Sequence, residues 1–169
     1  KSGKTVKKCS RCGSLTTTTI RYPKTIKLSA TSYTYNGKAK KPTVTVKDSA
    51  GKTISSSNYK ITYPSGRKNV GKYKVTVKFK GNYSGTKTLY FTINPVKTTV
   101  KSLTAGKKSL KVSITKKTTQ VTGYQIQYST NKSFKSAKTK TVSYKTTSTT
   151  LSKLSAKKTY YVRVRTYKT

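Results

Sequence analysis

The amino-acid sequence predicts an all-β protein made of two tandem antiparallel β-sandwiches. Three observations lead to this fold class. Short segments alternate apolar and polar residues with a period of two, and turn-forming residues separate them at intervals of about ten residues, as in known sandwiches. The 169-residue chain also contains 14 Tyr together with many Val, Ile and Thr, which fit half-buried strands.

The first sandwich is predicted within residues 25–95. Its clearest strand is 72–80, in which one set of side chains faces the core and the alternate set faces water. The inward set is Tyr73, Val75, Val77 and Phe79, and the outward set includes Lys72, Lys74, Lys78 and Lys80. The same alternation predicts strands at 43–47, 59–63 and 89–93.

Turn sequences separate the strands of this first block. Asn36-Gly37 predicts a type I′ hairpin, and residues 48–51 and 64–67 fit four-residue turns. Gly81-Asn82 predicts a further reversal. Asn94-Pro95 ends the block, because proline cannot donate a hydrogen bond to a central strand ladder.

A second sandwich is predicted within residues 96–169. Alternation again assigns one face of each strand to the core, with Tyr124 as an inward residue of the third strand. At roughly 70 residues, each sandwich lies near the lower size limit for independent folding. The strands are expected at 99–104, 109–115, 123–129, 138–143, 147–151 and 160–167.

The charge of the chain restricts its chemistry. There are 39 Lys and Arg residues against one acidic side chain, Asp48, and no histidine, which gives a net charge of +38. General acid/base catalysis uses His, Glu or Asp most often, so we expect no enzyme activity and no cofactor. The field of so many cations attracts polyanions such as wall teichoic acid, nucleic acid or sulfated glycans. The alternative is a solvated lysine surface that meets no polyanion.

Candidate contacts to a polyanion lie on two predicted strands. Lys72, Lys74, Lys78 and Lys80 share the outward face of strand 72–80, and Arg163 and Arg165 lie on strand 160–167. Outward-facing Tyr90 and Tyr161 are platforms on which a base would stack. Only five of the cations are arginines, the residue best suited to base-specific contacts, so there is little support for base-specific recognition. Nucleic acid is therefore expected to bind without sequence preference.

Two cysteines form the motif Cys9-Ser-Arg-Cys12, which is half of a zinc knuckle or a redox pair. A structural zinc site needs four ligands, and residues 1–169 contain no further Cys and no His, so these residues cannot complete one, and the remaining ligands would have to lie upstream of Lys1. A thioredoxin-like role would need a βαβ context, which the sequence lacks. We expect a disulfide between Cys9 and Cys12 in an oxidising location.

The second block resembles a fibronectin type III domain. The resemblance rests on Gly-Tyr-Gln-Ile-Gln-Tyr-Ser at 123–129 and on Leu154, which is followed six residues later by Tyr160. It implies that Tyr160 is a corner tyrosine, with its ring in the core and its hydroxyl tied to upstream backbone. Ile114 stands where such domains have a tryptophan. The chain stops after the sixth strand, at Thr169.

The first block, from Ile26 to Pro95, resembles immunoglobulin-like repeats of Gram-positive, especially clostridial and gut-commensal, surface proteins. The matching residues are 33–38 (Tyr-Thr-Tyr-Asn-Gly-Lys), 42–48 (Pro-Thr-Val-Thr-Val-Lys-Asp), Asn69-Val70-Gly71 and Gly81-Asn82-Tyr83-Ser84-Gly85. By this resemblance, residues 1–24 are a linker that forms the tail of a preceding module.

We expect the second sandwich, residues 96–169, to lack its last, seventh strand in this chain, which leaves strand 160–167 with an unpaired edge. Either the chain is cut before that strand, or another chain donates one, with residues 14–22 as a β-prone donor that would produce a homo-oligomer.

These observations predict an extracellular, cell-surface adhesion or wall-associating module that binds anionic polymers by diffuse electrostatics. No segment is apolar enough to insert in a membrane as a span. Two alternatives remain open. One is an adhesin that binds a host protein, for instance an immunoglobulin, through loops and a sheet face. The other is a structural subunit that self-assembles by strand donation.

Overall fold

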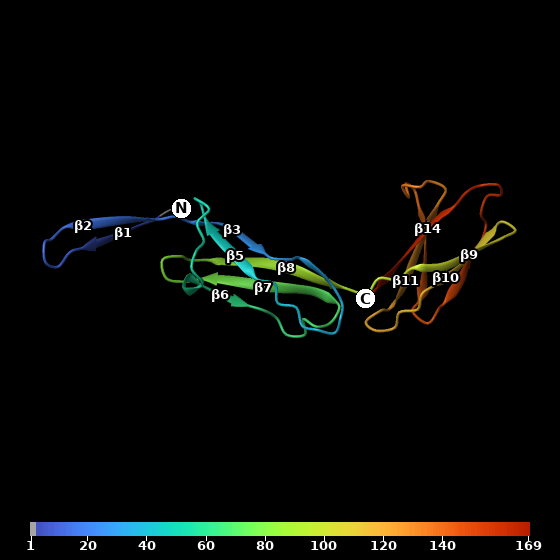
Figure 1. Cartoon of the computed structure of the whole chain (residues 1–169), viewed down its shortest axis with the longest axis horizontal. Helices are drawn as coiled ribbons and strands as arrows, with labels where there is room; N and C mark the ends of the chain where they lie inside the picture. Colours follow the sequence, from blue (N-terminus) through green and yellow to red (C-terminus); the bar gives the residue numbers. More distant parts are fainter. Residues whose placement is uncertain (1–2) are drawn as a thin grey trace. The chain divides into compact units, whose positions relative to one another are not determined.

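The computed structural model describes residues 3–169 of the chain. Regular structure in this part is almost entirely β, which confirms the predicted fold class. Contacts between Cα atoms divide the chain into two compact units (Figure 1). The second unit consists of Ile93–Thr169 together with two short segments, Thr34–Ala39 and Lys68–Gly71.

The chain begins with an antiparallel hairpin of β1 (Gly3–Lys8) and β2 (Leu15–Ile20), drawn in blue in Figure 1. The register runs from Gly3 opposite Ile20 to Lys8 opposite Leu15. Its apolar side chains are largely exposed, at 59% for Val6 and 64% for Leu15. The β-prone segment 14–22, considered above as a donor strand, is therefore paired along one edge with β1.

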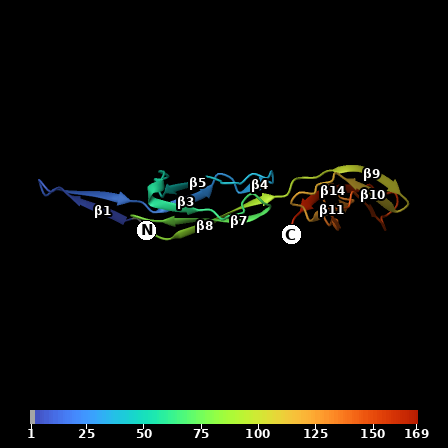
Figure 2. The same ribbon diagram turned by 90° about the horizontal axis from the view of Figure 1, so that it is seen from below.

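The first sandwich contains two sheets, which Figure 2 shows as separate layers. One sheet pairs β3 (Pro23–Leu28) with β5 (Val44–Asp48). The other has the order β4-β8-β7-β6. Its strands are β4 (Ser32–Thr34), β6 (Tyr59–Thr62), β7 (Gly71–Phe79) and β8 (Thr86–Asn94).

Alternation along these strands produces the core of the first sandwich. Val46 of β5, Val75 and Val77 of β7 and Phe91 of β8 are fully buried. The Phe91 ring stacks on Tyr73 with centroids 5.3 Å apart, and Tyr33 meets it edge-on at 5.8 Å. Aromatic contacts of this kind add to the free energy gained by burying the rings.

The predicted hairpin at Asn36-Gly37 is wrong. β4 pairs with β8 and β5 pairs with β3, so no ladder joins the two strands that flank this turn. A type I′ turn needs positive φ at both central residues. Gly37 has φ +74, whereas the φ angle of Asn36 is not positive. The Asn36 side chain instead accepts a hydrogen bond from the Lys38 amide. Strands β3 and β4 were also not anticipated.

The second sandwich contains two three-stranded sheets, in the orders β13-β10-β9 and β12-β11-β14. The first sheet consists of β9 (Val100–Gly106), β10 (Ser109–Ile114) and β13 (Ser148–Leu151). The second consists of β11 (Gly123–Ser129), β12 (Lys138–Ser143) and β14 (Tyr161–Tyr167). Among the described strands β14 pairs with β11 alone, so it forms a sheet edge.

The core of the second sandwich is a cluster of aliphatic side chains around Tyr124, which is fully buried. Ile114 is 3% exposed and fills a core position. Gly123 is required by close packing, because a Cβ at this position would overlap the Val142 carbonyl oxygen. The other buried members are Val112, Val121, Ile126, Leu151 and Leu154.

Candidate functional site

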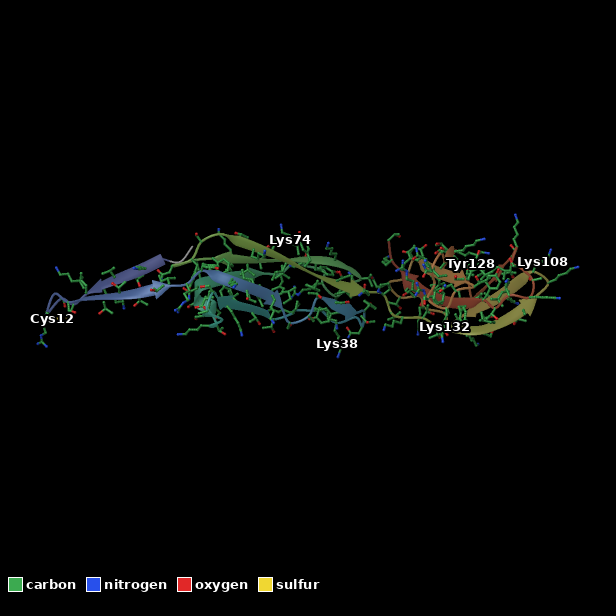
Figure 3. The ribbon with its side chains drawn as sticks, turned by 90° about the horizontal axis from the view of Figure 1, so that it is seen from above. Cys12, Lys38, Lys74, Lys108, Tyr128 and Lys132 are labelled. Carbon is green, nitrogen blue, oxygen red and sulfur yellow. The ribbon has the colours of Figure 1, made fainter. Side chains whose placement is uncertain are left out.

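Three of the four lysines predicted on strand 72–80 occupy the outer face of β7. Lys72, Lys74 and Lys78 are exposed at alternate positions, while the intervening side chains point into the core. Lys74 is labelled in Figure 3. Lys80 is also exposed but follows the strand, where its amide donates to the Asn58 carbonyl at 2.9 Å. It therefore lies beside the face, in the turn after β7.

Neighbouring strands extend this face. Lys60 of β6 lies directly opposite Lys78 in the antiparallel register. On β8, Tyr90 is 49% exposed, and the Lys72 Nζ lies 4.7 Å from the centroid of its ring. We call Lys60, Lys72, Lys74, Lys78 and Tyr90 the lysine face. This face combines four lysine charges with one exposed aromatic ring, Tyr90, which makes a cation–π contact with Lys72.

The only carboxylate side chain of the protein is engaged elsewhere. Asp48 is the last residue of β5, in the opposite sheet. Its Oδ1 accepts hydrogen bonds from the Ala50 and Lys52 amides, each at 2.9 Å, and Gly51 donates to its carbonyl at 3.0 Å. This acid therefore closes its own turn and does not neutralise the lysine face.

A second cationic face lies on the sheet of β11, β12 and β14. Arg163 and Arg165 are exposed on β14, and each Nε donates to the side-chain oxygen of a glutamine on β11. The Arg163–Gln127 distance is 2.7 Å and the Arg165–Gln125 distance is 2.8 Å. We call these four residues the arginine–glutamine row. They line a shallow cavity of about 130 Å³.

Phe134 also supports this row. The Arg163 guanidinium carbon lies 4.2 Å from the Phe134 ring centroid, which is a cation–π arrangement. A guanidinium has five N–H donors, so a bond from Nε leaves the two Nη groups available for a fork-like contact. The glutamines and the ring thus fix the orientation of the guanidinium groups, whose geometry suits two oxygens of a phosphate, sulfate or carboxylate.

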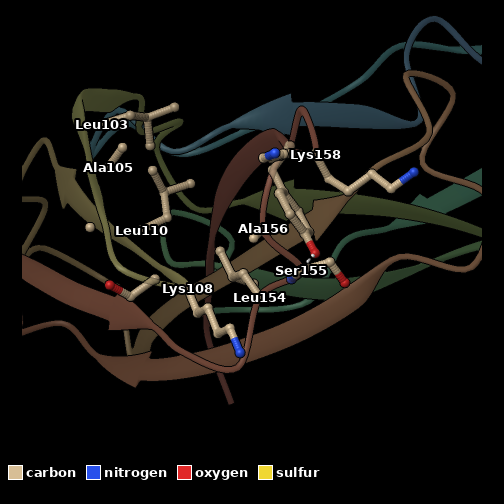
Figure 4. A pocket seen from close by; sticks show the side chains of 12 residues that line it. Leu103, Ala105, Lys108, Leu110, Leu154, Ser155, Ala156 and Lys158 are labelled. Carbon is tan, nitrogen blue, oxygen red and sulfur yellow. Dashed lines mark hydrogen bonds between the residues drawn. The ribbon is translucent and has the colours of Figure 1, made fainter.

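A larger cavity of about 330 Å³ lies beside the β9–β10 hairpin (Figure 4). Its lining includes the apolar side chains of Leu110 and Leu154 and the ring of Tyr160. Lys108 and Lys158 also line it. The Ser155 amide donates to the Tyr160 hydroxyl at 3.0 Å. This hydrogen bond lowers the pKa of Tyr160 below its ordinary value.

Leu154 and Tyr124 occupy structural positions in the second sandwich. Leu154 is 8% exposed and belongs to the core cluster. The Tyr124 hydroxyl donates to the Lys117 carbonyl at 2.9 Å and accepts from the Lys117 amide at 2.7 Å. The hydroxyl of this buried ring therefore satisfies both polar groups of one loop residue.

The cysteine pair lies in the turn between β1 and β2, and both side chains are exposed. Hydrogen bonds from the Cys12 thiol and amide, and from the Arg11 amide, lower the pKa of Cys9. Among residues 3–169 no group of three or more His, Cys, Asp and Glu side chains lies close enough to hold a metal ion. The disulfide remains a prediction.

Sequence reasoning missed several partners of the predicted cations. Lys60 has the same alternation signal as Lys78, but only strand pairing reveals that the two lie opposite each other. Gln125, Gln127 and Phe134 had no signal of their own, because their role depends on the register of β11 with β14 and on the fold of a loop.

Comparison with known protein families gives a match in the region of the second sandwich. Residues 94–169 match the family model of the fibronectin type III domain. This range contains β9 to β14, so the match covers the second sandwich. No curated protein matches the chain.

Two solved structures are similar to the chain at low identity. One comprises the chicken CNTN1 FN1-FN3 domains, with 18% identity and a TM-score of 0.43, and the match covers 99% of this chain and 72% of that one. The other comprises domains A168-A170 from titin, with 13% identity and a TM-score of 0.35, covering 98% and 77%. Within residues 3–169, no helix has the length and apolar character needed to cross a membrane.

Proposed function

We propose that this chain is a non-enzymatic, strongly cationic adhesion module of a secreted or cell-surface protein from a Gram-positive bacterium. It binds anionic polymers such as wall teichoic acid through exposed lysine and arginine side chains. Two points support the setting. Residues 26–95 resemble bacterial surface repeats, and the second sandwich matches a domain family that is common in cell-surface proteins.

The lysine face carries this proposal. Like charges directly opposite each other in a sheet are destabilising, and Lys60 faces Lys78 while Lys72 and Lys74 lie on the same face. The one carboxylate side chain lies in the other sheet. A bound polyanion would offset this repulsion between lysines. Its own condensed counterions would be released into solution when the lysines replace them.

The arginine–glutamine row provides a second type of contact. Its guanidinium groups are oriented by hydrogen bonds to the glutamines, whereas lysine ammonium groups are hydrated point charges on flexible stems. Neither face has the apolar centre that is typical of a protein–protein interface. Affinity for a polymer of repeating anionic groups, with little dependence on its sequence, is the function that this chemistry best supports.

The test compares two variants of equal charge. In one, Lys60, Lys72, Lys74 and Lys78 are changed to Gln. In the control, four exposed lysines outside both faces are changed in the same way: Lys52, Lys107, Lys132 and Lys168. Binding to purified teichoic acid and to duplex DNA is measured over a range of NaCl concentrations.

We expect the face variant to bind more weakly than the control, with a shallower salt dependence. For DNA, the slope of log K against log[salt] changes by about 0.9 for each phosphate contact that is lost. Equal slopes for the two variants would show that net charge alone governs binding and that the lysine face is not the contact surface. Changing Arg163 and Arg165 to Lys preserves the charge, and so tests whether the forked contact matters.

A host-protein extract serves as the third ligand. Binding by diffuse charge weakens steeply with salt, whereas a packed interface survives moderate salt. A host protein that remains bound to both variants at high salt would contradict the proposal and identify the chain as a host-binding adhesin.

A further inference from the structure

An open groove of about 580 Å³ lies on the outer face of the sheet β13-β10-β9, away from both cationic faces. Its volume is within the range of sites that hold a small molecule. The described residues that line it combine three lysines with serine and threonine hydroxyl groups, and they include no aromatic and no acidic side chain. The polar residues that matter here are Lys101, Ser102, Lys111, Ser113, Lys116 and Ser148.

The strand register places three serines in one row across this sheet. Ser113 of β10 lies opposite Ser102 of β9 and also opposite Ser148 of β13. The neighbours of Ser113 along the strand, Val112 and Ile114, are buried, so the row faces outward. Adjacent strands are about 4.8 Å apart, so the serines follow one another at about this interval. We call Ser102, Ser113 and Ser148 the serine row.

A β-bulge brings a lysine to this row. The register of β9 with β10 is regular as far as Ser102 opposite Ser113. The next pair, Val100 with Ile114, skips Lys101, which is therefore an extra residue of β9. In a regular strand consecutive side chains point to opposite faces, yet Lys101 and Ser102 both line the groove. The bulge thus directs the Lys101 side chain to the same face as the serines.

The hydroxyl groups of the serine row are available to a ligand. Within residues 3–169, none of the three takes part in a hydrogen bond with another protein group. The Thr115 hydroxyl at the end of the groove, in contrast, is paired with that of Thr99 at 2.8 Å. A hydroxyl group both donates and accepts, whereas a lysine ammonium only donates. The groove therefore places neutral two-way partners beside positively charged donors.

This combination suits a ligand with hydroxyl groups next to an anionic ester. Phosphate or sulfate oxygens accept charge-assisted hydrogen bonds from ammonium groups. The hydroxyl groups of a polyol or a sugar can donate to serine and accept from it. A DNA strand has no free hydroxyl group between its phosphates, and the groove has no aromatic ring on which a base could stack. The chemistry therefore favours a hydroxyl-bearing polymer over DNA.

We propose that the serine row, with Lys101, Lys111 and Lys116, binds one repeating unit of a hydroxyl-bearing anionic polymer, either a polyol phosphate or a sulfated saccharide. The lysines contact the phosphate or sulfate oxygens, and the serines contact the neighbouring hydroxyl groups. This inference rests on the proposed function for the class of polymer and deepens it by naming the unit that is recognised. It involves no residue of the lysine face or of the arginine–glutamine row.

The test compares two ligands of equal charge on the whole chain. Glycerol 3-phosphate has free hydroxyl groups, and methyl phosphate has none. An NMR titration of the backbone amides at constant ionic strength gives a dissociation constant for each ligand and locates its site. We expect saturable shifts in β9, β10 and β13, and glycerol 3-phosphate should bind about tenfold more tightly because it gains hydrogen bonds to serine.

Glucose 6-sulfate and methyl sulfate form a second pair of ligands. They separate the two sources of the same chemistry. A larger preference within the phosphate pair identifies a polyol phosphate as the ligand, and a larger preference within the sulfate pair identifies a sulfated saccharide.

Alanine variants of serine test the hydroxyl contacts without changing the net charge. The triple variant of the serine row should lose the preference for glycerol 3-phosphate over methyl phosphate. A matched control, which should keep this preference, changes three exposed serines outside the groove to alanine: Ser65, Ser133 and Ser152. The comparison of ligands on the parent chain does not require any variant to fold.

Three outcomes would overturn the proposal. They are equal dissociation constants within both ligand pairs, shifts that spread over all lysine-bearing strands without saturation, and a preference that survives in the triple serine variant. The four-lysine face variant leaves this groove intact and should keep the preference. Failure of the lysine-face proposal and failure of this one are therefore separate results.

Discussion

At the scale of single residues, the local environment gives two tyrosines opposite ionisation behaviour. The Tyr63 hydroxyl donates to the Pro42 carbonyl at 2.6 Å, and burial raises the pKa of Tyr63, with nearby Arg67 acting in the opposite direction. The Tyr160 hydroxyl accepts a hydrogen bond from the Ser155 amide, which favours the phenolate and lowers its pKa. A hydrogen bond that stabilises the phenolate lowers the pKa of Tyr160, whereas burial, which disfavours the charged form, raises the pKa of Tyr63.

We expect the two tyrosines to affect alkaline stability with opposite signs. Tyr160 contributes stability that is complete above the ordinary tyrosine pKa of about 10 and is lost as pH falls through its lower folded-state pKa. Tyr63 contributes stability below about pH 10 that is lost as pH rises through its higher folded-state pKa.

Ultraviolet absorbance titration checks this prediction. Tyr160→Phe should remove an early-ionising tyrosine, and Tyr63→Phe a late one. Tyr90→Phe is the control for an exposed ring. Identical titration curves for the Tyr63 and Tyr160 variants would contradict the assignment.

At the scale of elements, the pairing of β6 with β7 places like charges next to each other. Their register places Lys60 opposite Lys78, where the two Cβ atoms are about 5 Å apart. Natural sheets usually place opposite charges or neutral pairs at such positions. Retaining two lysines here is consistent with a face that meets an external anion.

Lys60→Glu should therefore stabilise the first sandwich and weaken its binding to polyanions. The expected gain is about 0.2–1 kcal/mol in the free energy of unfolding, because a repulsive cross-strand pair becomes attractive. Lys60→Gln, which only removes the repulsion, should give a smaller gain. Urea denaturation and a binding titration on the same samples measure both effects, and a variant that gains stability without losing affinity would contradict the argument.

The elements also show what sequence alone can predict. Strand β7 was identified because Val75, Val77 and Phe79 alternate with lysines, which is a purely local signal. Strand β4 has only three residues, Ser32–Thr34, and too short a pattern to be detected. The turn at Asn36-Gly37 was misassigned because strand pairing, which is not local, sends β4 to β8.

The same distinction applies to the candidate site. The exposure of Lys72, Lys74 and Lys78 follows from period-two alternation. Their neighbours Lys60 and Tyr90 come from other strands, so the face becomes visible only once the sheet order is known. The bonds from Arg163 and Arg165 to glutamines likewise require the register of β11 with β14.

At the scale of the whole molecule, net charge and local faces should govern different rate constants. The attraction that steers a polyanion toward the protein sums over all 39 cations, so it depends little on which lysines are removed. The lifetime of the complex depends on the residues in contact with the polymer.

We therefore expect the four-lysine face variant and its equal-charge control to show similar association rate constants, both falling as salt rises. Only the face variant should dissociate faster than the parent chain. Stopped-flow association and surface-based dissociation with a defined DNA duplex measure the two rates. Equal dissociation rates for the two variants would indicate that no particular face holds the polymer.

The turn closed by Asp48 has a further consequence for control of binding. The Asp48 side chain accepts hydrogen bonds from the Ala50 and Lys52 amides, and the chain contains no histidine, the side chain whose ordinary pKa lies between pH 5 and 8. Acidification of the surroundings would thus leave the positive charge almost unchanged, and a bound polymer would be released by ions or competing polyanions rather than by protons.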